Sequence, residues 1–265
     1  MNRVIPGAFM VAGWLLLLFW GTAEFFWGVA IAGTVVALIE FFRMVLPKLT
    51  GMPLYLSVSC CQLPVFATFY GRGDVVLAGV MASLLAVVAL ALHRFGRVND
   101  TLDYMTACGL AILYVALCLA HIVLIRHLPD GAFWLTMLVG IVAGSDTGAY
   151  YAGRAFGQRK LFPIISPKKT VAGVVGGMFA GVIAAEVISL LFSKNVNPFI
   201  LAVVAMGLIA IGIAGDLTES MIKRSVGVKD SGTILFGHGG ILDRLDSLLL
   251  ASPVLYYLLH FGILS

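Results

Sequence analysis

Charged side chains are scarce in this chain of 265 residues, of which 11% are Asp, Glu, Lys or Arg and 61% are hydrophobic. The mean hydropathy of +1.04 lies far outside the range of soluble domains. This scarcity excludes a soluble globular protein, and it leaves almost no sequence for a soluble domain beside the apolar runs. The composition therefore indicates an integral membrane protein.

Cysteine is also rare, and its placement argues against a zinc centre. The four cysteines lie inside apolar runs, and none shows the two-residue separation that is typical of paired zinc ligands. Free cysteines in apolar surroundings usually behave as small core residues. We interpret all of them in this way: Cys60, Cys61, Cys108 and Cys118.

The apolar residues fall into runs long enough for transmembrane helices. A helix needs about 20 apolar residues to cross roughly 30 Å of hydrocarbon, so this chain has room for about nine spans joined by short loops. We therefore expect an all-α, polytopic membrane bundle. The expected spans are 4–20, 25–42, 53–70, 75–93, 103–126, 131–152, 171–192, 198–215 and 245–263.

Basic residues are distributed unevenly among the expected loops. With the N-terminus in the cytoplasm, only Arg72, Arg126 and Lys194 fall outside, and every other Lys or Arg falls inside. This bias predicts a cytoplasmic N-terminus and an outside C-terminus, with the first apolar run kept as a span rather than cleaved as a secretory signal. The expected location is the cytoplasmic (inner) membrane of a bacterium. The two longest loops, 154–170 and 216–244, then share the cytoplasmic face and can meet.

The composition changes near residue 130. Residues 1–130 carry few buried charges and are expected to form a supporting half, whereas residues 131–265 hold the polar motifs and are expected to carry a cytoplasm-facing active site. Small residues four apart predict close packing of the sixth and seventh spans, and such faces can also join two subunits in a homodimer. They are Gly144, Gly148, Gly153 and Gly157 in one stretch and Gly173, Gly177 and Gly181 in the next.

The first polar motif lies in the sixth span. Asp146, Tyr150 and Gly153 recur at i, i+4 and i+7 and so share one helical face. An acidic side chain inside a span usually marks a functional site, so the motif predicts a cation or nucleotide contact. The alternative is a buried Asp that is hydrogen-bonded to a neighbouring helix.

The second motif is a basic loop before the seventh span. Lys168, Lys169 and Thr170 directly precede the expected helix start. The first turn of a helix offers unpaired N–H groups and the positive end of the helix dipole, which stabilise phosphate. Contact with anionic lipid headgroups is an equally good interpretation of the loop alone.

The third motif, in residues 215–247, holds the densest set of charges in the chain. Ionisable groups near bilayer depth are costly and usually face a cavity or one another. Four polar residues at i, i+3, i+4 and i+7 predict a polar stripe that extends the eighth span into the cytoplasm as a helix. They are Asp216, Glu219, Ser220 and Lys223.

A glycine pair, Gly239 and Gly240, precedes two carboxylates on the first turn of the last span, Asp243 and Asp246. The helix dipole keeps carboxylates at a helix N-terminus ionised, and oxygen ligands suit hard cations. Together with Asp216, these two carboxylates predict a Mg²⁺ site where two helix ends meet.

Cations surround the predicted metal site and would bind polyphosphate: Lys223, Arg224, Lys229 and Arg244. Ion pairing of Glu219 with Lys223 and of Asp243 with Arg244 is the alternative, but such pairs contribute under about 1 kcal/mol each. The combination of carboxylates, cations and glycines favours metal-assisted phosphoryl or nucleotidyl transfer.

These motifs resemble those of the phosphatidate cytidylyltransferases, also called CDP-diacylglycerol synthases. The C-terminal pattern of that family is a Ser, a Lys-Arg pair, a Lys-Asp pair, His-Gly-Gly, and Asp-Arg with a further Asp. It occurs here as Ser220, Lys223, Arg224, Lys229, Asp230, His238, Gly239, Gly240, Asp243, Arg244 and Asp246. The upstream matches are Asp146, Ala149, Tyr150, Gly153, Ser166, Pro167, Lys168, Lys169, Thr170, Gly173 and Gly177. The resemblance covers about half the chain, and the N-terminal half matches only in hydropathy.

Two positions depart from the family pattern. Ala172 stands before Gly173 where the family has Glu, and Phe236 with Gly237 stands before His238 where the family has Pro-Gly. Neither position is a predicted metal ligand. The missing Glu bears on substrate contacts, so a paralogue that acts on another lipid phosphate is an alternative.

The resemblance implies a nucleotidyltransferase that converts phosphatidic acid and CTP to CDP-diacylglycerol and pyrophosphate. It implies Mg²⁺ as cofactor, and a monovalent cation such as K⁺ beside it is left open. The implied metal ligands are Asp216, Asp243 and Asp246, and the implied catalytic residues are Asp243, Asp246, Lys223, Arg224 and His238. The expected substrate-binding residues are Asp146, Tyr150, Ser166, Lys168, Lys169, Thr170, Gly177, Ser220, Lys229, Asp230, Gly239, Gly240 and Arg244. His238 is expected to shape the backbone around the triphosphate rather than act as a base, because the lipid phosphate is already ionised at neutral pH.

The expected partners are CTP, phosphatidic acid and bilayer lipids, and no nucleic acid. Because acyl chains stay in hydrocarbon, the cavity should open both to the cytoplasm and sideways to the bilayer. An ion-coupled transporter with Glu40, Asp146 and Glu186 along an ion path is the alternative from another class. Transporters often contain repeated halves with interrupted helices, and no matching halves are visible in this sequence.

Overall fold

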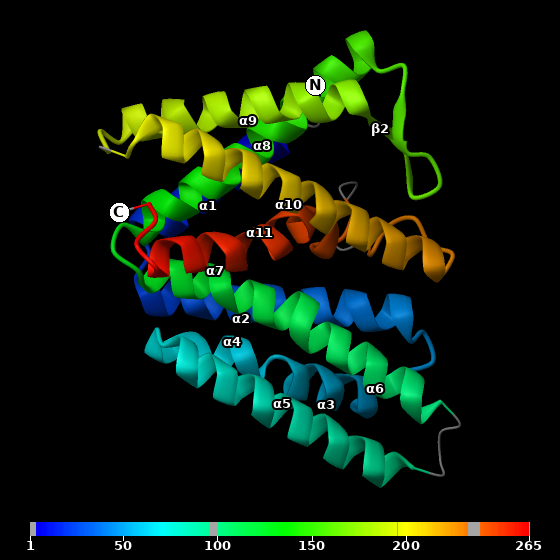
Figure 1. Cartoon of the computed structure of the whole chain (residues 1–265). Helices are drawn as coiled ribbons and strands as arrows, with labels where there is room; N and C mark the ends of the chain where they lie inside the picture. The colour runs from blue at the N-terminus through cyan, green and yellow to red at the C-terminus, as the bar shows by residue number, and fades with distance from the viewer. Residues whose placement is uncertain (1–3, 96–99, 195, 233–238, 265) are drawn as a thin grey trace.

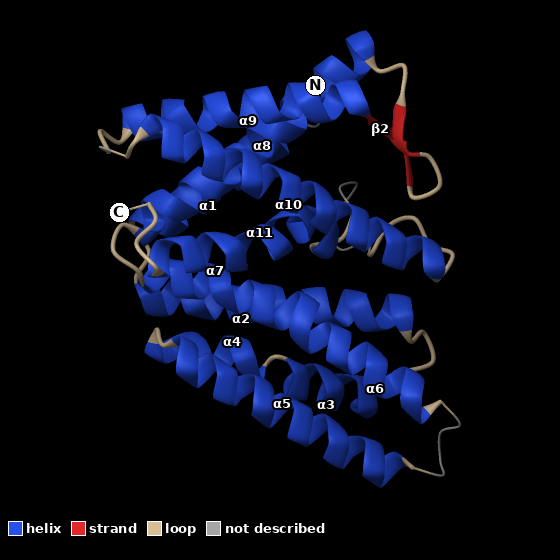
Figure 2. Cartoon of the chain, viewed as in Figure 1, coloured by secondary structure: helices blue, strands red, loops and turns tan. Residues whose placement is uncertain are grey.

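The computed structural model describes residues 4–95, 100–194, 196–232 and 239–264, which form helices and one short hairpin (Figure 2). The first half contains α1 (Val4–Phe19), α2 (Ala23–Val45), α3 (Met52–Cys61), α4 (Leu63–Ala67), η1 (Thr68–Tyr70), α5 (Gly73–Arg94), α6 (Thr101–Leu110), the π-helical η2 (Ala111–Ala116) and α7 (Leu117–His127). The second half contains α8 (Gly131–Phe156), β1 (Lys160–Phe162), β2 (Ser166–Thr170), α9 (Val171–Leu191), α10 (Pro198–Ser225) and α11 (Leu242–His260).

Six helices in the described ranges are long and apolar enough to cross a membrane: α2, α5, the continuous α6–η2–α7, α8, α9 and α10. A seventh results if α3 and the segment Leu63–Tyr70, which are bent by 41°, form one span. The expected all-α, multi-pass membrane protein is thus confirmed, whereas nine spans and the orientation of the termini stay predictions. α1 has 16 residues, a length of about 24 Å, and the first turns of α11 carry Asp243, Arg244 and Asp246.

The continuous helix from Thr101 to His127 is the most enclosed of the candidate spans, because 78% of its most apolar window is buried. α11 packs against it, and the Ser252 hydroxyl donates to the Cys118 carbonyl oxygen over 2.9 Å. Figure 1 shows α3, α4 and α5 on one side of this central layer and α8, α9 and α10 on the other. The two predicted halves therefore meet along α7 and α11.

The turns and loops collect at the two ends of the bundle (Figure 1). The β1–β2 hairpin, the C-terminal end of α10 and the connection after α2 lie at the right-hand end, and the C-terminus lies at the left-hand end. The two loops that were predicted to share a face, 154–170 and 216–244, therefore leave the bundle at the same end within the described residues.

The segment that was expected to be a plain loop contains a two-stranded antiparallel hairpin. Lys160 pairs with Thr170 and Phe162 with Ser166, and the register shifts between these pairs. Cross-strand pairing depends on partners that no local pattern reveals in so short a segment, so the hairpin was missed. It places Lys168 and Lys169 on a strand that leads directly into α9.

The predicted close packing of the sixth and seventh spans is confirmed by α8 and α9. A Cβ atom at Gly148 would meet the Ala180 side chain and lie 2.6 Å from the Gly176 carbonyl oxygen. A Cβ atom at Gly177 would lie 2.9 Å from the Ser145 carbonyl oxygen. Only glycine lets the two backbones approach this closely. Gly177, which was expected to bind substrate, therefore serves helix packing.

α10 crosses α11 at a similarly short distance, at the point where both helices carry carboxylates. A Cβ atom at Gly215 would lie 2.5 Å from the Asp246 carbonyl oxygen. The Tyr114 hydroxyl, from η2, donates to the Gly215 carbonyl oxygen over 3.1 Å and so fixes α10 from the central layer. This crossing places Asp216 beside Asp246.

Candidate active site

A polar hollow of about 220 Å³ lies at the end of the bundle where the hairpin leaves it. Its walls come from the C-terminal part of α8, from β2 and the first turns of α9, and from Ile213 of α10. The close α8–α9 contact holds these walls together. The hollow gathers residues that were predicted to bind substrate from two separate motifs: Asp146, Tyr150, Lys168, Lys169 and Thr170.

Thr170 caps the N-terminus of α9 and accepts one of the N–H groups that were expected to bind phosphate. Its hydroxyl oxygen accepts from the Gly173 N–H group over 3.1 Å, and the Val171 N–H group donates to the Arg159 carbonyl oxygen over 3.0 Å. These two N–H groups of the first turn are therefore already paired. The side chains of Lys168 and Lys169 line the hollow beside this capped helix start.

Lys169 joins the hollow to α10. Its ammonium group forms an ion pair with the Asp216 carboxylate, and the Ser220 hydroxyl donates to the other Asp216 oxygen over 3.4 Å. Both charged side chains are partly exposed. The stripe that was predicted on the eighth span is therefore linked to the hollow through Lys169.

Three carboxylates from three helices interact electrostatically beside this ion pair. Asp216 of α10 is close enough to repel both Asp146 of α8 and Asp246 of α11, and Asp146 and Asp246 also repel each other. Like charges at short range are costly in a partly desolvated site unless a cation is near. The arrangement creates a local excess of negative charge.

Lys223 lies at the centre of a second polar cluster, between α10 and α11. Its ammonium group donates to Glu219 over 2.7 Å and to Asp243 over 2.6 Å. The Glu219 side chain is fully buried, and burial of a carboxylate requires such a partner. Lys223 was expected to bind phosphate, but in this position it holds the two helices together. Of the two ion pairs considered as the alternative to a metal site, Glu219 with Lys223 is present, whereas Asp243 pairs with Lys223.

Asp243 is held by backbone groups as well as by Lys223. The Ser231 and Gly240 N–H groups donate to the same carboxylate oxygen over 3.0 and 2.9 Å. Burial acts to raise the pKa of Asp243, but the hydrogen bonds from Lys223, Gly240 and Ser231 outweigh it and lower the pKa below its ordinary value. Asp243 is therefore ionised at neutral pH, with both oxygens in use.

Gly239 and Gly240, the two glycines of the predicted motif, are each required by a different close contact. Gly239 has a φ of 80°, and a Cβ atom there would lie 2.9 Å from an Asp243 oxygen. At Gly240 a Cβ atom would lie 2.5 Å from a Glu40 oxygen. Both glycines thus permit a close approach of the backbone to a carboxylate.

Glu40 of α2 belongs to the site, although no sequence motif linked it to the other polar residues. Its side chain is 2% exposed, and its two oxygens accept from the Ile241 and Leu242 N–H groups over 3.1 and 3.0 Å. These are N–H groups at the start of α11, where a carboxylate is stabilised by the helix dipole. A single Glu inside an apolar span indicated that Glu40 has some polar partner. The partner could not be predicted from the sequence, because it consists of backbone N–H groups, which every residue except proline carries.

The remaining predicted residues lie around these clusters. Arg224 is exposed in the last turn of α10 and donates to the Val228 carbonyl oxygen over 3.4 Å, and Lys229 and Asp230 are exposed just beyond the helix. Ser166 begins β2. Arg244 is exposed on the opposite face of α11 from Asp246, and His238 lies outside the described residues.

The chemistry of the carboxylate set fits a hard divalent cation, because oxygen ligands with excess negative charge surround one small region. Within the described ranges, however, no three such side chains converge closely enough to hold one ion together. Asp216 is turned to Lys169 and Asp243 to Lys223. Asp216 and Asp246 are the better placed of the predicted metal ligands, because Asp243 already has three donors.

The comparison with known proteins extends along the whole chain, including the half that resembled the family only in hydropathy. The pattern of the cytidylyltransferase family matches residues 1–262. The phosphatidate cytidylyltransferase of Bacillus subtilis (strain 168) is 34% identical over 261 residues, 97% of either chain. That of Staphylococcus haemolyticus (strain JCSC1435) is 35% identical over 92% of either chain. That of Haemophilus influenzae (strain ATCC 51907 / DSM 11121 / KW20 / Rd) is 40% identical over 68% of this chain and 65% of its own. The resemblance that the motifs indicated is thereby confirmed, and this chain belongs to the cytidylyltransferase family.

Proposed function

We propose that this protein is a phosphatidate cytidylyltransferase, which joins CTP and phosphatidic acid to form CDP-diacylglycerol and pyrophosphate. One observation carries the proposal: at one end of a membrane helix bundle, Asp146, Asp216 and Asp246 approach one another beside Lys168 and Lys169. The names of the similar proteins support the same activity. Acidic and basic groups of this kind suit the transfer of a nucleotidyl group to a phosphate.

The reaction needs charge neutralisation and alignment more than a strong base. A phosphate oxygen of the lipid attacks the α-phosphorus of CTP, a new P–O bond forms, and the bond to the β-phosphate oxygen breaks to release pyrophosphate. The attacking oxygen is already ionised at neutral pH, so no side chain has to remove a proton. The protein contributes by holding both anionic substrates in line and by stabilising the charge that moves to pyrophosphate.

The cations divide into two groups by position. Lys168 and Lys169 line the hollow and are proposed to bind the triphosphate, with Asp146 and Tyr150 as its wall. Arg224 and Lys229 are exposed at and just beyond the C-terminal end of α10 and are proposed to meet the entering nucleotide, together with Asp230. Lys223 is proposed to act as a positioning residue, since its ammonium group is engaged by Glu219 and Asp243.

We propose Mg²⁺ as the cofactor, with Asp216 and Asp246 as its principal ligands and Asp243 as a third that must first give up a present partner. A divalent ion would neutralise phosphate charge and relieve the repulsion among the carboxylates. A monovalent cation such as K⁺ could share the excess negative charge.

The finer membrane arrangement is also a proposal. Nine spans are obtained if α1, α11 and the bent pair of α3 with Leu63–Tyr70 all cross the bilayer in addition to the six longer helices. A cytoplasmic N-terminus then places the hollow at the inner face of the cytoplasmic membrane, where CTP is available. The small-residue faces of α8 and α9 pack within one chain, so their packing does not require a homodimer.

A direct assay tests the activity. Purified protein in detergent is incubated with labelled CTP, phosphatidic acid and Mg²⁺, and the lipid-linked CMP product is measured. We expect product formation that EDTA abolishes and added Mg²⁺ restores, with Asp246→Asn lowering kcat by about a hundredfold or more, the scale of removing one charged group from an electrostatic site. Asp103→Asn, at an exposed carboxylate of α6, is the matched control and should retain activity.

The assay also separates the alternatives. A paralogue would form product with another lipid phosphate and not with phosphatidic acid. Ion flux through proteoliposomes without any nucleotide product would indicate a transporter and would refute the proposed activity.

A further inference from the structure

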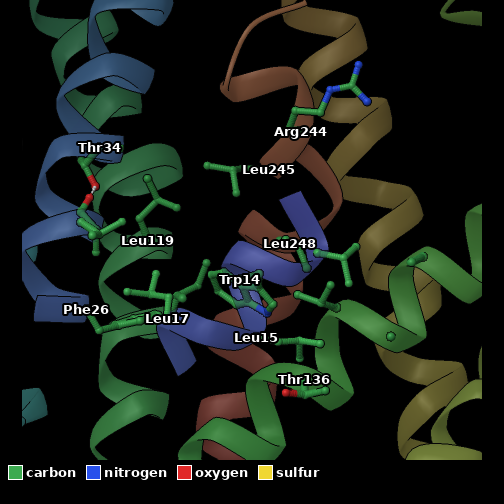
Figure 3. Close-up of a pocket in the computed structure, with 18 of the residues that line it drawn as sticks. Trp14, Leu15, Leu17, Phe26, Thr34, Leu119, Thr136, Arg244, Leu245 and Leu248 are labelled. Carbon is green, nitrogen blue, oxygen red and sulfur yellow. Dashed lines mark hydrogen bonds between the residues drawn. The ribbon is translucent and has the colours of Figure 1, made fainter. Parts of the chain in front are cut away.

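A second cavity, with a volume of about 570 Å³, lies between α1, α2, α7, α8 and α11, with Ile188 of α9 at its edge. Figure 3 shows side chains from these helices pointing into it, with Trp14 and Phe26 among them and Arg244 at one end. The volume falls within the roughly 300–1,000 Å³ that is usual for small-molecule sites. The proposed nucleotide chemistry leaves this cavity unused.

The walls of the cavity are largely apolar, apart from Arg244 and the Trp14 indole N–H group, which is buried without a hydrogen-bond partner among the described residues. The two threonines that line it, Thr34 and Thr136, donate their hydroxyl groups to the backbone oxygens of Ala30 and Ala132, over 2.8 Å in both cases. Their hydrogen-bonding capacity is thus spent within their own helices. Among the described lining residues, Arg244 alone is charged. A ligand with a long apolar part and one anionic group matches this lining.

α11 separates the cavity from the carboxylates. Arg244, Leu245 and Leu248 line the cavity, whereas Asp243 and Asp246 belong to the polar clusters. At about 100° per residue, the two sets occupy different faces of the same helical turns. The anionic end of a ligand in the cavity would therefore lie within one helical turn of the proposed reaction site.

The cavity also reaches the outer surface of the bundle. Val11 of α1 and Val29 of α2 line it, and their side chains are 57% and 43% exposed. The outer surface of these helices faces hydrocarbon in a membrane. An acyl chain could enter between α1 and α2 without crossing a polar region.

We infer that this cavity holds one acyl chain of the lipid phosphate substrate, with Arg244 contacting the phosphate. The inference rests on the proposed function and extends it by naming where the lipid lies. Bilayer tails are as apolar as the cavity walls, so little hydrophobic free energy is gained when a chain moves from one to the other. The cavity therefore aligns the lipid and limits the length and shape of the chain, while the charged groups supply affinity.

Gly33 allows the cavity to be filled without disturbing its walls. It lines the cavity, and a Cβ atom there meets no heavy atom within 4 Å. Gly28 lies on the same helix in equally open space but does not line the cavity. Leu has a higher helix propensity than Gly, so Gly33→Leu and its matched control Gly28→Leu should both fold.

The test compares phosphatidic acids with eight-carbon and eighteen-carbon chains in the same detergent assay. For Gly33→Leu we expect the KM of the long-chain lipid to rise about tenfold, the scale on which apolar pockets discriminate added methylene groups. The KM of CTP and the turnover of the short-chain lipid should stay near those of the unmodified protein. Gly28→Leu should leave all of these values unchanged. The inference would be overturned if Gly33→Leu had the same kinetics as the unmodified protein with both lipids. It would also be overturned if the variant lost activity equally with the short-chain and the long-chain lipid.

A binding measurement keeps this inference separate from the proposed activity. Phosphatidic acid with a photoreactive group near the end of one chain is irradiated with the unmodified protein and both variants, and the labelled peptides are identified. We expect labelling of cavity residues that Gly33→Leu suppresses and Gly28→Leu does not. Equal labelling by a phosphatidylcholine with the same chains would show that the cavity holds bulk lipid, and it would overturn the assignment to substrate. If lipid binds in the cavity but no nucleotide product forms, the proposed function fails and the binding site stands.

Discussion

At the scale of single residues, the site depends on a buried carboxylate, that of Glu40, which accepts hydrogen bonds from two backbone N–H groups. Glu40 lies far from Ile241 and Leu242 in the sequence, yet it accepts both of their N–H groups while almost fully buried. The carboxylate replaces the solvent that these N–H groups would otherwise need. It thereby fixes where α11 begins, and with it the positions of Asp243 and Asp246.

Glu40→Gln tests this role. The amide group keeps one acceptor oxygen and turns a donor towards an N–H group, so one charge-assisted hydrogen bond of about 1.5–3 kcal/mol is lost. We expect a lower midpoint of thermal unfolding and a kcat reduced about tenfold, equivalent to about 1.4 kcal/mol. The KM of CTP should change little, because Glu40 lies outside the hollow.

Glu24→Gln is the matched control, since Glu24 lies on the same helix with an exposed side chain. It should keep both the unfolding midpoint and kcat. Wild-type behaviour of Glu40→Gln in both measurements would show that the start of α11 does not need this carboxylate.

Gly239→Ala and Gly227→Ala separate backbone strain from contact with Asp243. Both glycines have positive φ, 80° and 74°, so each substitution should cost about 1–2 kcal/mol of stability. At Gly227 a Cβ atom meets nothing within 4 Å, whereas at Gly239 it presses on the Asp243 carboxylate. Thermal unfolding should register both substitutions, and kcat should fall only for Gly239→Ala. Equal kcat values for the two variants would remove the functional reason for glycine at position 239.

At the scale of elements, close helix contacts bring the polar groups together. α8 lies against α9 through glycines, and α10 lies against α11 at Gly215. Each contact carries a carboxylate on at least one of its helices, Asp146 on α8 and Asp216 with Asp246 at the second crossing. The spacing of the glycines in the sequence predicted the first contact, because small residues on one helical face are local information. It did not predict the hairpin, whose strands are defined only by each other.

Gly148→Ala tests the α8–α9 contact. The added methyl group would overlap Ala180 and the Gly176 carbonyl group, so the helices must separate, at a cost of about 1–3 kcal/mol. Gly207→Ala on α10 is the matched control, because a Cβ atom there lies in open space, and it should be neutral or stabilising by up to about 1 kcal/mol. Unfolding in detergent measures both variants. A Gly148→Ala protein as stable as the control would contradict the close packing.

At the scale of the whole molecule, the polar site and the basic loops share one end of the bundle (Figure 1). With the proposed orientation, the cations that favour the cytoplasm lie at the same end as the proposed nucleotide site. The apolar cavity beside α11 connects that end to the lipid-facing surface. A substrate with an anionic head and apolar tails can use both features at once.

Single cysteines test this orientation. Ile164, in the turn of the hairpin, is 92% exposed, and Phe261, near the C-terminus, is 71% exposed. In right-side-out vesicles, a membrane-impermeant thiol reagent should label Phe261→Cys but not Ile164→Cys, and inverted vesicles should give the opposite result. The unmodified protein, whose four cysteines are buried or half-buried, provides the background. Labelling of Phe261→Cys in inverted vesicles only would refute a C-terminus outside, and labelling of both positions from one side would refute their placement on opposite faces.

The sequence by itself determined the membrane class, the positions of the helices, the packing of α8 on α9 and the family. These properties follow from hydropathy, residue spacing and short motifs, which are local along the chain. The tertiary structure alone decided which charges meet. Lys223 pairs with Asp243, Thr170 accepts one of the N–H groups expected to bind phosphate, and Glu40 caps α11. The direction of each side chain depends on how helices from distant parts of the sequence cross, and a buried charge accepts whichever partner that crossing provides.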